Sequence, residues 1–245
     1  MSRVVFRPLI GLIVAFLVAA PFVLPPGLLT PLTYIGLYAI VCLGLVLLTG
    51  MVGITSFGQA AFVGISAYTT AWLTVQAGWS PWLSALPAIA ICSAAAALLG
   101  LLTIRLSGHY LVLGTIAWGL SLYYLFGYIP ALGGYNGLGG VPTLQVPGLD
   151  ASPTLTFHVL IWSLNGLFFL AAANLLNSRS GRAIRSLRDG VLTESLGIPG
   201  ARLKVEMFVW AAALAGVTGW ISAHYLSIVN PGPFGIHASV DYIFM

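Results

Sequence analysis

Residues 178–206 read SRSGRAIRSLRDGVLTESLGIPGARLKVE, and most of the charge in the chain lies in this stretch. The 245 residues include 9 Lys or Arg and 5 Asp or Glu. The charged residues within the stretch are Arg179, Arg182, Arg185, Arg188, Asp189, Glu194, Arg202, Lys204 and Glu206. The sequence on either side is almost entirely apolar, as far as Asp241 on the C-terminal side. We interpret the stretch as a cytoplasmic segment through which a membrane protein meets a partner.

The composition predicts a membrane protein. Hydrophobic residues make up 59% of the chain and charged residues 6%, whereas soluble domains carry about 25% charged residues. We therefore expect an all-α, polytopic helical membrane protein surrounded by lipid. No basic patch of the kind that binds nucleic acid is evident. Cys42 and Cys92 lie in apolar runs, which favours packing roles over a disulfide or a metal site.

The apolar runs predict about seven transmembrane helices and the start of an eighth. The expected spans are 9–24, 30–48, 57–75, 83–104, 110–129, 156–176 and 207–229, and the eighth begins near Ser239. A cleaved signal peptide is the alternative for the first run, because Ala19 and Ala20 could end it. Since Met245 lies only a few residues into the eighth run, we expect 1–245 to be a single transmembrane domain that is incomplete at its C-terminus.

The placement of Lys and Arg predicts the orientation. With the N-terminus inside, the loops 25–29, 77–82, 130–155 and 230–238 fall outside, and none contains Lys or Arg. The inner turns contain Arg105 and the coupling loop 178–206. This asymmetry agrees with the positive-inside rule and predicts a multi-pass protein with a cytoplasmic N-terminus.

The stretch GMVGITSFGQAAF at 50–62 is unusual for a span. Its glycines weaken a helix, and Ser56 and Gln59 place polar groups at the membrane edge. Irregular backbone at membrane depth is tolerated only against protein or a watery cavity. The stretch therefore predicts either a wall of a permeation path, with Ser56, Gln59 and Gly64 as candidates, or a locally satisfied re-entrant turn.

Small residues recur at helical spacing in two spans, such as Ala60 with Gly64, and Ala215 with Gly219. Such stripes predict close helix packing, and a sliding surface is the alternative. The loop GGYNGLGGVP at 133–142 carries many backbone N–H groups and the amide of Asn136, a further path candidate. It predicts either a flexible outer turn or a lid or docking surface for a soluble partner.

The charged stretch divides into two parts. Arg182, Arg185 and Arg188 form one stripe, and Ile184, Leu187 and Val191 form an apolar stripe beside it. This pattern predicts a helix on the membrane surface. After Gly190, residues 192–196 predict a short second helix that Gly197 and Pro199 stop. We expect the pair to dock onto protein, and a basic loop that binds lipid phosphates is the alternative.

Several motifs resemble those of a known transporter family. They are SFGQAAFVGISAY (56–68), GGYNGLGGVP (133–142), GRAIRSLRD (181–189), SLGI (195–198) and AHYLSIVNPGPFGIHASVDYIFM (223–245). Together they resemble the LivM-type permease subunit of branched-chain amino acid ABC importers, over nearly the whole chain. The sequence departs from that family at 190–195, where it is slightly shorter and lacks an acid expected near Val191.

The resemblance implies a heteromeric importer in a bacterial inner membrane. A LivH-like permease would pair with this subunit, ABC ATPase subunits would dock inside, and a periplasmic substrate-binding protein would deliver the cargo. The resemblance assigns ATPase coupling to Arg182, Arg185, Asp189, Glu194, Leu196 and Gly197. No GxxxxGK[ST] occurs, so we expect no nucleotide site, cofactor or enzyme activity in this chain, with Mg-ATP used by partner subunits.

Two alternatives remain beside an importer for Leu, Ile or Val. The first is an ABC permease for urea or other amides, because related permeases share the scaffold. The second is a self-sufficient secondary transporter or channel, which would be expected to carry ionisable residues within the membrane. Residues 9–104 and 110–149 contain no Asp, Glu, Lys, Arg or His, which disfavours ion coupling.

Overall fold

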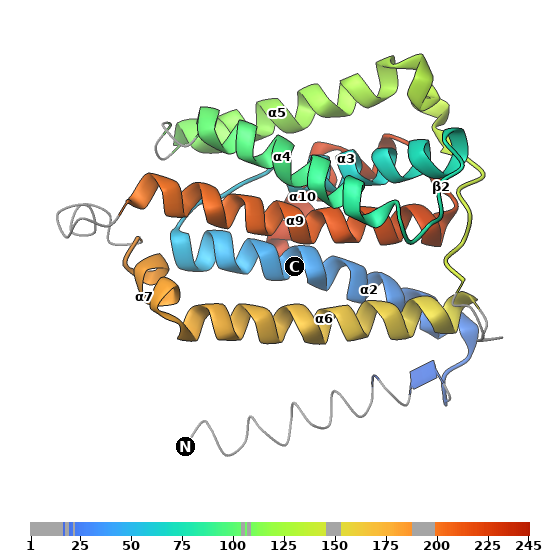
Figure 1. The fold of residues 1–245 in the computed structure, drawn as a ribbon, viewed down its shortest axis with the longest axis horizontal. Helices are drawn as coiled ribbons and strands as arrows, with labels where there is room; N and C mark the ends of the chain where they lie inside the picture. Colours follow the sequence, from blue (N-terminus) through green and yellow to red (C-terminus); the bar gives the residue numbers. More distant parts are fainter. Residues whose placement is uncertain are drawn as a thin grey trace.

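The computed structural model describes residues 17, 20, 21, 23–103, 106, 109–145, 153–187 and 199–245. Over these residues the protein is a bundle whose long helices lie roughly side by side (Figure 1). The long helices are α2 (Pro26–Leu45), α4 (Ala85–Thr103), α5 (His109–Tyr128), α6 (Pro153–Asn177) and α9 (Gly200–Leu226). The predicted helical class is confirmed, with one small exception: β1 (Leu138–Gly139) and β2 (Ile228–Val229) form a two-stranded antiparallel pair.

Shorter helical elements connect and fill the bundle. They are η1 (Val46–Val52), α3 (Gln59–Ala71), η2 (Trp72–Gln76), η3 (Pro130–Leu132), η4 (Gly134–Asn136), α7 (Arg179–Ser186), η6 (Gly232–Phe234) and α10 (Ile236–Phe244). Local sequence explains several boundaries. Proline at the first position starts α2, where its missing N–H costs nothing. The Ser178 hydroxyl accepts a hydrogen bond from the Gly181 N–H and caps α7.

Five described helices are long and apolar enough to cross a membrane. They are 27–52, 85–103, 109–128, 153–177 and 200–226, which correspond to the predicted second, fourth, fifth, sixth and seventh spans. Helices suit this environment because every backbone polar group must be satisfied without water. The first predicted span lies mostly outside the described residues. Helix α10 forms where the eighth was expected, and the total count stays a prediction.

The predicted third span folds as an inner helix of the bundle. Helix α3 and η2 run together from Gln59 to Gln76, and 11 of the 13 residues of α3 are buried. This element is not among the five spanning candidates. Its small and polar residues suit close contact with neighbouring helices better than contact with lipid.

Helices α3, α4 and α9 pack closely through small residues. A Cβ at Gly219 of α9 would collide with the Val63 carbonyl oxygen of α3. The Cys92 thiol of α4 lies 3.3 Å from the Phe62 oxygen and 3.2 Å from the Ala212 oxygen. The small-residue stripe of α9 thus lies at a tight junction of three helices, as the packing interpretation predicts, whereas Gly64 of α3 faces Phe126 and Phe234 instead.

The helices at the edges of the bundle are much more exposed. Three of the 20 residues of α5 are buried, and four of the 25 residues of α6. In Figure 1, α5 and α6 lie on opposite sides of the bundle. Their open faces are available to lipid or to another protein. We call the end of the bundle with α7 and the start of α9 the basic end, and the opposite end with β1 and β2 the strand end (Figure 1).

Candidate functional site: the buried start of α3

The chain leaves helical structure between η1 and α3. Gly53 has φ +76°, a left-handed conformation that glycine adopts without strain. Residues 53–58 then lead to α3, whose first turn begins after Gly58 without a side-chain cap. We call residues 53–60 the α3 start. Because Phe62 stacks edge-on against Phe208 of α9 with ring centroids 5.5 Å apart, the α3 start lies beside α9 in the half nearer the basic end.

Hydroxyl groups from three segments hold the backbone N–H groups of the α3 start. The Phe57 N–H donates to Thr115 Oγ1 of α5 at 3.1 Å. The Ala60 N–H donates to Ser239 Oγ of α10 at 3.2 Å, and the Gly58 N–H donates to Ser56 Oγ at 3.4 Å. These N–H groups are therefore satisfied, as the re-entrant alternative requires, by one hydroxyl of the segment itself and by two from the neighbouring helices α5 and α10.

Gln59 is the exception to this satisfaction. Its side chain is 1% exposed, and neither Nε2 nor Oε1 has a hydrogen-bond partner in the described part of the chain. A buried amide without partners costs on the order of 1–3 kcal/mol. In native proteins such a group calls for an explanation, such as a bound water, an ion or a functional role. Ser56, which is fully buried, lies at the same place, so these two sequence candidates come together.

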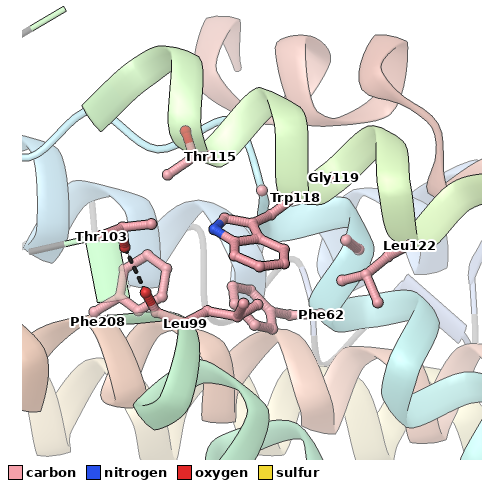
Figure 2. A pocket seen from close by; sticks show the side chains of 10 residues that line it. Phe62, Leu99, Thr103, Thr115, Trp118, Gly119, Leu122 and Phe208 are labelled. Carbon is pink, nitrogen blue, oxygen red and sulfur yellow. Dashed lines mark hydrogen bonds between the residues drawn. The ribbon is translucent and has the colours of Figure 1, made fainter. Parts of the chain in front are cut away.

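An apolar pocket adjoins the α3 start (Figure 2). It lies between α3, α4, α5 and α9, and its walls include Gly58, Phe62, Leu99, Trp118 and Phe208. The free volume is about 10 Å³, close to the space that one water needs. Thr115 both lines this pocket and holds the Phe57 N–H, which joins the pocket to the α3 start.

The other two path candidates lie elsewhere. A Cβ at Gly64 would lie 2.7 Å from Phe126 Cε2 and 3.0 Å from Phe234 Cγ, so Gly64 makes room for an aromatic cluster. Asn136 is exposed at the strand end, in η4. The structure therefore brings Ser56 and Gln59 together but places Gly64 and Asn136 away from them.

The Gly-rich loop at the strand end is strapped to the bundle. His224 Nδ1 lies 2.6 Å from the Pro142 oxygen, and the Val141 N–H donates to the Ser227 oxygen. The Trp82 indole N–H donates to the Gln145 oxygen at 3.0 Å. With the β1–β2 pair, these bonds connect residues 138–145 to the end of α9, whereas the flexibility of the turn stays a prediction.

Helix α7 is amphipathic, as predicted, but its apolar side does not face lipid. Ile184 and Leu187 are 2% and 5% exposed and belong to the protein core. The expected helix lying on the membrane surface is corrected accordingly: α7 packs against the bundle, while Arg182 and Arg185 remain exposed. Asp189, Glu194, Leu196 and Gly197, together with Arg105, lie outside the described residues.

Sequence reasoning missed most of the pocket and the clamps on the α3 start. Thr115 lies 58 positions from its partner Phe57, and Ser239 lies 179 positions from its partner Ala60. A local sequence pattern cannot indicate contacts over such separations. Trp118 and Phe208 lie in apolar runs and look like ordinary residues of a span. Ser239 is a hydroxyl residue within an apolar run close to Asp241, and this position could have indicated a buried polar contact.

The apolar spanning helices, the buried polar α3 start and the basic end define a polytopic helical membrane protein. Residues 27–245 match the family described as "Branched-chain amino acid transport system / permease component". The chain belongs to this family, and the resemblance seen in the motifs is confirmed.

Two curated relatives are similar over most of the chain. The chain is 32% identical over 243 residues to the high-affinity branched-chain amino acid transport system permease protein LivM of Salmonella typhimurium (strain LT2). It is 31% identical to the protein of the same name from Escherichia coli (strain K12). Each comparison covers 89% of this chain and 57% of the relative, so the chain spans little more than half the length of these relatives. No solved structure matches the chain.

Proposed function

We propose that this chain is a permease subunit of an ATP-driven importer for branched-chain amino acids and forms half of the translocation path. Family membership and the names of both relatives support the cargo class. The single observation that carries the location of the path is the buried amide of Gln59, whose two polar atoms have no partner among the described residues.

The α3 start suits the polar half of an amino acid. A zwitterion carries opposite charges but no net charge, and a neutral amide offers it both donors and an acceptor. The start of a helix also favours a carboxylate. When α5 or α10 moves away, the N–H groups of Phe57 and Ala60 lose their hydroxyl partners and become available to the cargo. This is alternating access at one polar point within the membrane.

The surfaces of the bundle supply places for the proposed partners. The exposed residues of α7 at the basic end would meet ABC ATPase subunits, with Asp189, Glu194, Leu196 and Gly197 continuing that contact. The strapped loop at the strand end would meet a periplasmic substrate-binding protein. The open faces of α5 and α6 would meet a LivH-like permease and lipid. The proposal includes a cytoplasmic N-terminus, a location in a bacterial inner membrane, and Mg-ATP bound only by the partners, as the positive-inside pattern and the family membership favour.

Uptake into vesicles tests the proposal. The chain, a LivH-like permease, the ATPase subunits and a binding protein are reconstituted together, with labelled leucine, valine and urea offered separately. We expect leucine and valine uptake that needs internal Mg-ATP and survives collapse of the proton gradient. Uptake of urea alone would replace the cargo with an amide. Uptake by this subunit alone, driven by an ion gradient, would instead establish a secondary transporter.

A further inference from the structure

The pocket beside the α3 start has walls of two kinds. Phe62 and Phe208, which are 2% and 5% exposed, form part of the α3–α9 core. Trp118 of α5 is 37% exposed and forms the facing wall (Figure 2). Because α5 has few buried residues, its side of the pocket is the one that can move while the α3–α9 side stays fixed.

The two hydroxyl groups that line the pocket are already hydrogen-bonded within the protein. The Thr103 hydroxyl donates to the Leu99 oxygen at 2.6 Å, as the dashed line in Figure 2 shows. The Thr115 hydroxyl donates to the Val112 oxygen at 2.9 Å and accepts from the Phe57 N–H. With both hydroxyls already engaged, the free surface is that of methyl groups and aromatic rings. An aliphatic group is therefore the ligand that this lining favours.

The polar α3 start is directly beside this apolar surface. Gly58 lines the pocket, and the next residue is Gln59 with its unpartnered amide. Gln59 itself does not line the pocket, but two consecutive residues at the α3 start thus carry an apolar lining position and a group that can bind the charged end of a zwitterion. A lipid acyl chain could fill the apolar pocket but has no group that could form a hydrogen bond with the amide.

We propose that this pocket takes the branched aliphatic side chain of the amino acid during transport, with Trp118 as the wall that moves to admit it. The proposal rests on the proposed function for the identity of the cargo. In the present state the free volume of about 10 Å³ is too small for such a side chain. Displacement of Trp118 and α5 both enlarges the pocket and releases the Phe57 N–H from Thr115.

The test alters the pocket volume and measures cargo preference. Leu99→Phe fills the pocket, and Leu98→Phe is the matched control on the exposed side of the same helix. Uptake of leucine and valine is measured in the reconstituted importer with one binding protein throughout. One methylene in an apolar pocket changes specificity by about tenfold or more. We expect Leu99→Phe to lower the leucine-to-valine uptake ratio by about tenfold, whereas Leu98→Phe leaves it unchanged.

Leu99→Ala, which enlarges the pocket, should shift the ratio toward leucine, and it keeps the test decisive if Leu99→Phe fails to insert. An unchanged ratio in inserted, partner-bound Leu99→Ala and Leu99→Phe would overturn the proposal. Native mass spectrometry of the purified importer tests whether the pocket binds a lipid acyl chain instead of the cargo. Loss of bound phospholipid from Leu99→Phe, with an unchanged uptake ratio, would make the pocket a lipid site and overturn the proposal. If wild type transports neither leucine nor valine, the proposed function itself fails.

Discussion

The hydroxyl of Ser66 in α3 donates a hydrogen bond of 2.6 Å to the carbonyl oxygen of Gly216 in α9. This bond connects residues 150 positions apart and lies one helical turn from Gly219, whose Cβ position meets the Val63 oxygen. Gly216 also lies 3.3 Å, measured from an ideal Cβ, from the Cys92 thiol of α4. The three helices α3, α4 and α9 therefore form one closely packed unit, and hydroxyl groups of α5 and α10 hold the N–H groups of the α3 start beside it.

Close packing predicts a strong effect of bulk at Gly219. Its Cβ position meets the Val63 oxygen, and Ser66 Cβ lies 2.9 Å away, so Gly219→Leu would force α3 and α9 apart. We expect a loss of stability of about 3 kcal/mol or more, seen as a lower midpoint in thermal unfolding of the detergent-purified protein. Gly166→Leu in α6 is the control, because nothing lies within 4 Å of its Cβ position. Equal midpoints for both variants would contradict the packing argument.

A substitution of Gln59 should change stability and transport in opposite directions. Gln59→Leu removes a buried group without partners, so we expect stability to rise by about 1 kcal/mol. Transport should nevertheless fall by about tenfold, since the lost hydrogen bonds to a charged cargo are worth about 1.5 kcal/mol or more. Thermal unfolding and vesicle uptake measure the two effects. Gln76→Leu, at an exposed position of η2, should alter neither. Full transport by Gln59→Leu would remove Gln59 from the path.

The contact between His224 and Pro142 should slow hydrogen exchange in the loop at the strand end. His224→Phe deletes a 2.6 Å contact to the loop, and one such hydrogen bond contributes about 1 kcal/mol. Amide hydrogens in residues 138–145 should then exchange about fivefold faster, as measured by mass spectrometry. His237→Phe, on exposed surface of α10, is the comparison. Unaltered exchange in His224→Phe would mean that the β1–β2 pair and Trp82 hold the loop without it.

Apolar runs made five spans predictable, because length and hydropathy alone decide whether a helix can cross a membrane. The third span differs because neighbouring protein, rather than lipid, surrounds α3, and a single sequence does not reveal which helices are enclosed. Helix α7 differs from its prediction for the same reason. The spacing of Ile184 and Leu187 predicted an amphipathic helix, but the protein core, and not the membrane, covers its apolar side. The pocket depends on long-range pairs such as Phe57 with Thr115, which leave no local pattern.

Under the proposed function, the exposed arginines of α7 are the place where an ATPase subunit would contact the chain. The apolar side of the helix is anchored through Ile184, and the Arg185 guanidinium donates to the Leu176 oxygen at the end of α6 at 2.9 Å. Force on α7 would therefore reach α6 directly. Arg182 is exposed, so its charge can meet an acidic ATPase surface without disturbing the fold. Arg182→Glu should lower ATP hydrolysis stimulated by loaded binding protein by about fivefold, whereas insertion and thermal stability stay unchanged because surface changes cost little.

Arg182→Lys separates charge from shape at this position. A lysine retains the positive charge but not the planar, five-donor guanidinium. If charge attraction alone draws the ATPase, Arg182→Lys restores stimulated hydrolysis, and raising the salt concentration weakens both wild type and the lysine variant. If a paired hydrogen bond is needed, lysine does not restore it. Wild-type hydrolysis and ATPase co-purification in Arg182→Glu would exclude Arg182 from the contact, and the coupling element would then have to lie beyond α7 toward residues 188–198.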